Sequence, residues 1–407
     1  MTTYDWEKIQ GMTPLVDELP GELAPYKLSV GEGIRFDLGD WHLTTMARFS
    51  DTAGEFSLSR VALPGGSQSP FLTTPGHSFL HVLGGELRIW FEGELHRVVA
   101  GDSVNIPADT PFSIRADAVV NSFYWYSTDE WLYQLAGELG VGTASHIFSR
   151  TPQHAVGDLF SSELAASLGV TVTDTAYTDV EPAALDRLPA GEQAFVTKAG
   201  RGDRYETYQQ VNTYPVRSRN NGGRFFAMDT RGAKQGYIPL HFHQQHAENF
   251  FCMEGIVKIH ANGQEIVLTP GDFLQAPAGT IHSFAHAANN TRMMGILNPP
   301  VFEKFFEYMN DPTDAYVQQE GGEFYFPAEG FGRRGPGNWG SARVSVSHSA
   351  CSCSRVTSAS TGSVGAVATA SSASPASHRA RKSRKPAAMP SRSKDPTSCA
   401  SVVGAQG

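Results

Sequence analysis

The sequence predicts an all-β fold made of two tandem jelly-roll barrels (double-stranded β-helices), with a few short helices and a disordered C-terminal tail. Short runs rich in β-branched and aromatic residues recur between Gly, Pro and Asp turn signals, which is typical of closed barrels. The chain also resembles itself when it is shifted by 170 residues, which indicates an internal repeat. From Ser341 onward it has no aromatic residue, so that segment cannot bury enough apolar surface to fold.

The first barrel is predicted within residues 1–150, with residues 1–40 wrapped around it. Pro64, Gly65 and Gly66 are expected to turn the chain between two strands. Asp129–Leu139 is predicted as a helix, because its Trp and Leu residues recur at helical spacing. The predicted strands are Trp41–Arg48, Phe56–Leu63, Phe79–Leu83, Glu86–Phe91, Leu95–Val99, Ser103–Ile106, Phe112–Ile114 and Val119–Tyr126.

Residues 151–205 are predicted to link the barrels, with short helices near Ser161–Leu168 and Pro182–Leu188. The second barrel is predicted within residues 206–325. Val301–Met309 after it is expected to be helical, with an aromatic stripe on one face. We favour core or interface packing for this stripe, and a lid over the barrel mouth is the alternative. The strands predicted at the two ends of this barrel are Tyr208–Val216, Arg224–Asp229 and Arg292–Leu297.

The tail, residues 326–407, is predicted to be disordered. From Ser341 it holds nine Lys or Arg residues and one acidic residue, so the preceding residues carry a net charge of −17 against −9 for the whole chain. A basic arm for an acidic surface is one interpretation. We favour a dispensable extension, and out-of-frame translation would also explain the abrupt change of composition.

Composition excludes several classes of protein. The acidic net charge gives no reason to expect a nucleic-acid partner, and no apolar run is long enough to span a membrane. The first residues lack the form of a signal peptide. Cys252 is the one cysteine before the tail, which argues against a disulfide framework and for a reducing, cytoplasmic location.

The stretch from Gly236 to His286 contains the residues that indicate chemistry. His241 and His243 lie two positions apart, so in a strand both imidazoles face the same side. Glu248 follows, and His282 begins a later predicted strand. Three imidazoles and a carboxylate that converge inside a barrel would form a first-row transition-metal site with open coordination positions. The competing interpretation is a sheet with incidental surface histidines.

Strand alternation also predicts what surrounds this site. Phe250 and Cys252 share the face of Glu248, and Phe284 and His286 share the face of His282. The predicted pocket is therefore largely apolar and aromatic, with no cluster of Arg or Lys. Such a lining matches a planar aromatic compound that chelates through adjacent oxygens better than it matches a small dicarboxylate or a sugar phosphate.

The repeat removes every candidate ligand from the first barrel, which leaves one metal per chain. His77 and His81 lie nearby, but alternation from Ser78 points them outward or into an interface. The residues at the ligand positions are Phe71 for His241, Thr73 for His243, Ser78 for Glu248 and Phe112 for His282.

These residues resemble the two motifs of the cupin superfamily. His241, His243, Glu248 and Gly255 match the first motif, with Gly236 one residue nearer than usual. The second motif is matched up to His282, although its final Asn is here His286. The segment HFHQQHAENFFCMEG, together with the two barrels, resembles the quercetin 2,3-dioxygenases (flavonol 2,4-dioxygenases) over residues 20–325.

The resemblance implies a bicupin oxidoreductase that cleaves the heterocyclic ring of a flavonol with dioxygen, giving a depside and carbon monoxide. It implies His241, His243, Glu248 and His282 as ligands of one divalent Fe, Mn, Co, Ni or Cu ion. It also implies Glu248 as the base that takes the proton of the flavonol 3-hydroxyl. A homodimer is compatible with the sequence. The alternatives are an oxalate decarboxylase- or oxidase-like cupin and a non-catalytic, metal-stabilised binder of small aromatics.

Overall fold

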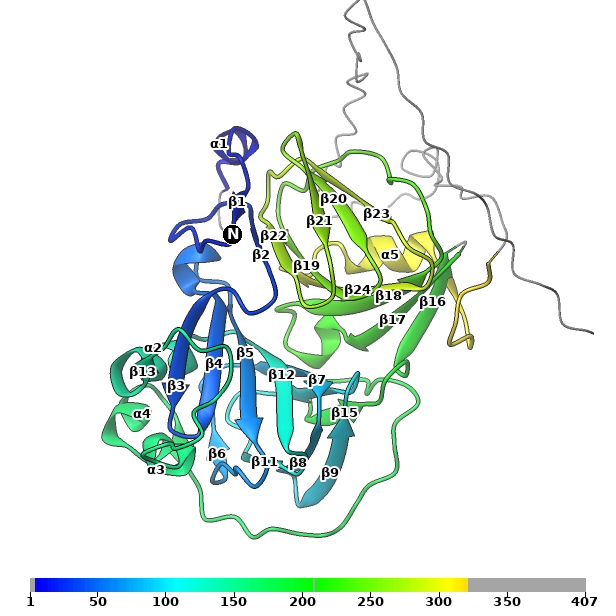
Figure 1. Cartoon of the computed structure of the whole chain (residues 1–407). Coiled ribbons are helices and arrows are strands. Elements are labelled where there is room, and N and C mark those ends of the chain that lie inside the picture. The colour runs from blue at the N-terminus through cyan, green and yellow to red at the C-terminus, as the bar shows by residue number, and fades with distance from the viewer. Residues whose placement is uncertain (1–3, 208, 321–407) are drawn as a thin grey trace, which may run out of the picture. The chain divides into compact units, whose positions relative to one another are not determined.

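The computed structural model of the chain describes residues 4–207 and 209–320. Strands dominate these residues, and they gather into two barrels accompanied by a few short helices (Figure 1). The prediction of an all-β fold with two tandem barrels is therefore confirmed. The tail predicted to be disordered from residue 326 lies outside the described residues. No helix in the described part of the chain is both long and apolar enough to cross a bilayer.

The first barrel consists of two sheets, with strand orders β13-β3-β4-β5-β12-β7-β10-β15 and β14-β6-β11-β8-β9. Large aromatic side chains, among them Trp41, Phe112 and Trp125, fill the space between them. Its elements are β3 (Ile34–Leu38), β4 (Trp41–Ala47), β5 (Ser57–Pro64), β6 (Leu72–Thr73), β7 (Ser78–Gly84), β8 (Glu86–Phe91), β9 (Glu94–Val99), β10 (Ser103–Ile106), β11 (Phe112–Ala116), β12 (Val120–Ser127), α2 (Trp131–Leu139), β13 (Val141–Gly142), α3 (Val156–Phe160), α4 (Glu163–Ser167), β14 (Thr171–Val172) and β15 (Phe195–Thr197).

The strands predicted for this barrel are all present, with ends that differ by a few residues, and the two predicted helices that became α2 and α4 are confirmed. The helix predicted over Pro182–Leu188 is wrong, because this segment is not helical. Leu185 instead forms an isolated parallel bridge with Thr197 of β15. A bridge to the next strand along the chain therefore takes the place of the local helical pattern.

The second barrel has the strand orders β1-β2-β22-β19-β24-β18-β17-β16-β25 and β21-β20-β23. Its elements are α1 (Trp6–Gln10), β1 (Leu15–Val16), β2 (Tyr26–Leu28), β16 (Asp203–Thr207), β17 (Gln210–Val216), β18 (Phe226–Gly232), β19 (Ala247–Glu254), β20 (Val257–Ala261), β21 (Gln264–Leu268), β22 (Phe273–Ala276), β23 (His282–His286), β24 (Thr291–Asn298), α5 (Glu303–Met309) and β25 (Asp311–Pro312).

Strands cross the predicted domain limits in both directions. The expectation that residues 1–40 wrap the first barrel holds for β3 but is wrong for β2, which pairs antiparallel with β22 of the second barrel. In the other direction β15, from the predicted linking segment, pairs with β10 of the first barrel. A buried apolar cluster shared by both barrels explains the exchange, since Tyr26 and Phe273 pack there together.

The structure confirms the internal repeat in its backbone conformation. Gly85 and Gly255 have φ of +86° and +76°, and Gly101 and Gly271 have φ of +90° and +95°. These values lie in the region that favours glycine, so each pair occupies equivalent turns. Short 3₁₀ helices also recur, at Phe49–Asp51 and Ser218–Asn220, each with the same side-chain capping pattern.

We expect Tyr26→Ala to lower the free energy of unfolding by about 3–5 kcal/mol, because it empties a buried aromatic site between the barrels. It also removes the hydrogen bond that the Tyr26 hydroxyl donates to the Met46 carbonyl at 2.7 Å. Val16→Ala, on the neighbouring strand and 55% exposed, is the control and should change the free energy by less than about 0.5 kcal/mol. Denaturant titration measures both, and equal effects would contradict the assigned role of β2.

Candidate metal centre

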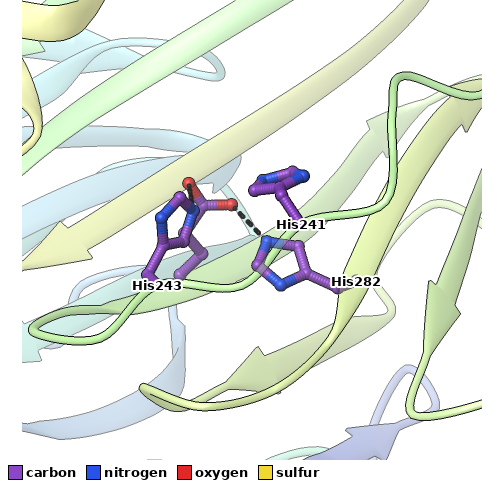
Figure 2. A group of neighbouring side chains, drawn as sticks. His241, His243 and His282 are labelled. Atoms are coloured by element: carbon purple, nitrogen blue, oxygen red, sulfur yellow. Dashed lines mark hydrogen bonds and ion pairs between the residues drawn. The ribbon is translucent and has the colours of Figure 1, made fainter. Parts of the chain in front are cut away.

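Four side chains meet at one end of the second barrel. His241 and His243 lie between β18 and β19, Glu248 lies on β19, and His282 begins β23. Their potential ligand atoms all lie within 4.8 Å of one another. Figure 2 shows the imidazoles of His241, His243 and His282 grouped around a common centre. The structure thus brings together the four residues that the sequence motif predicts as ligands.

Backbone hydrogen bonds hold the ligand-bearing segments together. The His241 N–H donates to the His282 carbonyl at 3.0 Å, and the His282 N–H donates to the His241 carbonyl at 2.8 Å. The Gly279 N–H donates to the His243 carbonyl at 2.7 Å. The spacing of the three histidines is therefore fixed by main-chain pairing as well as by side-chain packing.

Two of the imidazoles are oriented by backbone carbonyls. Nδ1 of His241 lies 2.9 Å from the Pro239 carbonyl, and Nδ1 of His282 lies 2.8 Å from the Thr280 carbonyl. A carbonyl only accepts, so each Nδ1 carries a proton and, in the neutral ring, each Nε2 presents a lone pair. This is the usual support of a metal-binding histidine.

The Glu248 carboxylate faces these lone pairs. Its Oε2 lies 3.2 Å from Nε2 of His282, and its Oε1 lies 3.1 Å from Nε2 of His243. The buried Nε2 of His243 has no aligned hydrogen-bond partner among the described residues. Buried lone pairs that face a carboxylate are unfavourable without a positive charge between them. The donor set therefore fits one divalent first-row ion.

The protonation states of these side chains also fit a bound metal ion. Burial, reinforced by the neighbouring imidazoles, holds the pKa of His241 well below its usual range, so this ring is neutral at pH 7. Burial alone would raise the pKa of Glu248. Attraction to His243 and His282, when these rings carry a second proton, outweighs it and holds that pKa well below its usual range. An ionised carboxylate thus attracts positive charge to the centre, and a metal ion can supply that charge in place of protons.

An apolar cavity that opens to solvent adjoins this group on one side. His241 and Glu248 form one part of its wall, and no other lining residue carries a charged group. Phe250 and Phe284 line the cavity as predicted. Further apolar walls come from Met228, Met293, Leu297 and Ile238.

Two predicted pocket residues lie outside this cavity. The Sγ of Cys252 is 3.9 Å from the Glu254 carbonyl, and its side chain is packed in the core with Val257. His286 is fully buried, next to the backbone of Gly232. Both share the predicted face of their strands, but they lie four residues beyond the ligand on each strand, where the barrel interior is filled.

Side chains fill the equivalent part of the first barrel. Phe112 lies against Trp125, and the Ser78 hydroxyl accepts a hydrogen bond from Trp125 Nε1 at 3.0 Å. His77 and His81 are buried; His77 contacts Phe225 of the second barrel and His81 bonds with Ser103. Among the described residues, the four side chains of the second barrel are the group suited to hold a metal.

Comparison with known proteins agrees with this architecture. The Cupin domain model matches twice, at residues 59–123 and 231–296. Quercetin 2,3-dioxygenase of Bacillus subtilis is 33% identical over 311 residues, which cover 74% of this chain and 90% of that protein. The chain belongs to the quercetin 2,3-dioxygenase family. It is therefore a cupin oxidoreductase with dioxygenase relatives across most of its length.

Two further comparisons are more limited. The quercetin 2,3-dioxygenase of Aspergillus japonicus is 32% identical over 108 residues, which cover 25% of this chain and 31% of that protein. A solved oxalate decarboxylase of Bacillus subtilis superposes with a TM-score of 0.45 at 14% identity, over 67% of this chain and 77% of that chain. The assignment to the dioxygenase family rests on the long match alone.

His246 lies beside the group of His241, His243, Glu248 and His282 without joining it. Its ring stacks on His243 with centroids 4.0 Å apart and on Phe302 with centroids 5.1 Å apart. Neither of its nitrogens has a hydrogen-bond partner among the described residues. It therefore packs as a flat ring that limits rotation of the His243 imidazole.

The N-terminal helix α1 supports the same centre from outside the barrel, which the sequence did not predict. Trp6 stacks on Phe242, between two of the histidines, with centroids 5.6 Å apart. A Cβ on Gly279, whose φ is +101°, would lie 2.6 Å from Trp6 Cα, so only glycine admits this contact. Asn262 Nδ2 donates to the Ile9 carbonyl at 2.7 Å.

Helix α5 closes the cavity on another side. Its Phe305, Phe306 and Met309, with Phe302 at its start, line the cavity. The predicted helix is confirmed, and its aromatic stripe packs against the barrel as the favoured interpretation expects, since Phe306 lies against Phe226 with ring centroids 6.0 Å apart. Arg217 anchors the helix, because its guanidinium pairs with Glu303 and Glu307 as well as with Asp203.

We expect Arg217→Met to lower the free energy of unfolding by about 3–5 kcal/mol, because it leaves the buried Glu303 carboxylate without its partner. Exposed Lys304→Ala on the same helix is the control and should have little effect. Adding Glu303→Leu to Arg217→Met should restore much of the loss, since it removes the unpaired charge. Denaturant titration of the three variants measures these changes. If Arg217→Met were as stable as Lys304→Ala, Arg217 would not be an anchor of the helix.

Proposed function

We propose that this protein cleaves the heterocyclic ring of a flavonol such as quercetin, consuming one dioxygen and releasing a depside and carbon monoxide. In this proposal His241, His243, Glu248 and His282 hold one divalent first-row metal ion. The observation that carries the proposal is the wall of the cavity, where His241 and Glu248 of the three-histidine, one-glutamate group face a largely apolar space whose other lining residues carry no charge. The 33% sequence identity with the Bacillus subtilis enzyme, over most of both chains, supports the proposal.

The cavity lining disfavours the oxalate alternative. A small dicarboxylate would need cationic side chains to offset its charge when it leaves water, and no Lys or Arg lines the cavity. A planar aromatic substrate instead gains stability from burial against Phe250 and Phe284. Release of carbon dioxide from oxalate by the purified protein would favour the alternative.

The roles of the protein groups follow from their positions. A metal ion held by the four side chains would supply Lewis acidity and one-electron chemistry with dioxygen. Glu248 lines the cavity with an ionisable oxygen, so it is placed to accept the proton of the flavonol 3-hydroxyl. The walls from Phe250 and from helix α5 exclude water, which strengthens polar interactions inside the site.

We expect one metal ion per chain, because the first barrel has Phe71, Thr73, Ser78 and Phe112 at the ligand positions. Replacing His241 and His243 together by Ala should abolish metal retention. His260→Ala, on β20 and outside the ligand group, should retain one equivalent. Elemental analysis after dialysis measures this, and a second equivalent that survives the double replacement would disprove a single site.

The substitution Glu248→Gln should separate the role of Glu248 as a metal ligand from its role as a base. Gln keeps the size and an oxygen donor, so we expect metal to be retained in part while turnover per bound metal falls roughly 100- to 10,000-fold. The rate should recover in part at higher pH, where the flavonol hydroxyl ionises before it binds. Glu254→Gln, at the far end of the same strand, is the matched control. Turnover per metal equal to that of the control at neutral pH would leave Glu248 as a ligand only.

A further inference from the structure

One position in the cavity wall lacks a side chain without a structural reason in the fold. Gly295 lies in the middle of β24, where it is aligned with Phe250 on one neighbouring strand and with Met228 on the other. All three residues line the cavity. Glycine in the interior of a strand is destabilising by roughly 0.5–1 kcal/mol relative to Ala, so its presence calls for an explanation.

The usual structural explanations do not apply to Gly295. Its φ is outside the left-handed region, and β24 pairs with β18 without a register shift. No other backbone approaches it closely, because a Cβ there would meet Leu297 Cδ1 at 3.6 Å and the Met228 carbonyl at 3.9 Å, both ordinary contacts. Among the causes of a strand glycine, the close approach of a ligand fits a residue that lines a cavity.

The end of the cavity beyond Gly295 is polar but uncharged. The Thr230 hydroxyl donates to Asn212 Oδ1 at 2.8 Å, and both side chains are buried and line the cavity. Asn212 Nδ2 makes a long contact of 3.4 Å with Thr207 Oγ1. A lone pair on Thr230 Oγ1 and an N–H of Asn212 are thus suited to a hydroxyl that both donates and accepts.

Strand register places this polar pair opposite the metal centre. Glu248 is aligned with Leu297, and Thr230 is aligned with Met293, four residues along the same strand. Four residues of strand span about 13 Å. This is the reach of a three-ring planar molecule together with the hydrogen bond at its far end.

We infer that a ring of the substrate lies in a slot over Gly295, and that a phenolic hydroxyl on the outer part of the molecule binds Asn212 and Thr230. The slot favours substrates with a planar ring, and the Asn212–Thr230 pair favours substrates that carry a hydroxyl group on that outer part. The inference rests on the proposed function, because that function supplies the chelation of the substrate by the metal. The slot concerns only the binding of the substrate and not its cleavage.

Equilibrium binding in the absence of dioxygen tests the slot without turnover. The probes are quercetin and 3-hydroxyflavone, which has the chelating oxygens but no outer hydroxyls. We expect Thr230→Val to weaken binding of quercetin roughly 5- to 50-fold and that of 3-hydroxyflavone less than about twofold. Thr213→Val, on the strand next to Thr230 but outside the cavity lining, should bind both probes as the wild type does.

Gly295→Val should weaken binding of both probes by about tenfold or more, because its side chain fills the slot. Metal content should equal that of the wild type. Should this variant fold poorly, Gly295→Ala, whose methyl the backbone accommodates, should weaken both probes in the same direction. The proposed slot would be wrong if Gly295→Val or Thr230→Val bound the probes with the affinities of the wild type. It would also be wrong if the wild type bound neither probe. A wild type that binds quercetin but releases no carbon monoxide would instead count against the proposed reaction.

Discussion

The reciprocal backbone hydrogen bonds between His241 and His282 are the contact on which the site depends. They join the segment before β19 to the start of β23, and so close the barrel at the end where the proposed ligands gather. With that closure, Glu248 on the intervening strand faces His282 and His243 across distances of 3.2 and 3.1 Å. The cavity, its polar far end and the wall formed by α5 all take their positions from the same closed barrel. A loss of this pairing would therefore disperse ligands and cavity together.

Much of this arrangement is readable from the sequence. Two-residue alternation places Phe250 and Phe284 on the wall of the cavity because a strand has only two faces. The same rule fails for Cys252 and His286, since it gives the face of a residue but not its depth along the barrel. The contacts of Trp6 with Phe242 and of Tyr26 with Phe273 were beyond reach, because no local pattern links residues more than 200 positions apart. The helix predicted over Pro182–Leu188 is wrong for a different reason, because local propensity does not include the bridge that Leu185 forms with β15.

The two barrels show how one backbone supports opposite interiors. Equivalent glycines adopt the same positive φ in both copies, and short 3₁₀ turns recur at matching places. In the first copy Trp41, Phe112 and Trp125 fill the interior, while in the second Gly295 lines an open cavity beside His241 and Glu248. The filled copy contributes residues such as Phe79 and Tyr126 to the apolar cluster that both barrels share. A barrel without ligands is thus retained as packing surface for the barrel that has them.

The pairing of β2 with β22 has a consequence for biosynthesis. Tyr26 and Gln275, which lie opposite each other in that pair, are separated by 249 residues. At typical elongation rates, Tyr26 leaves the ribosome roughly 12 to 50 s before its partner strand exists. The first barrel can finish its sheet much earlier, once β15 has emerged. The nascent N-terminal segment must then stay unpaired and unaggregated until β22 has emerged, so these early residues join the sheet only with strands made much later.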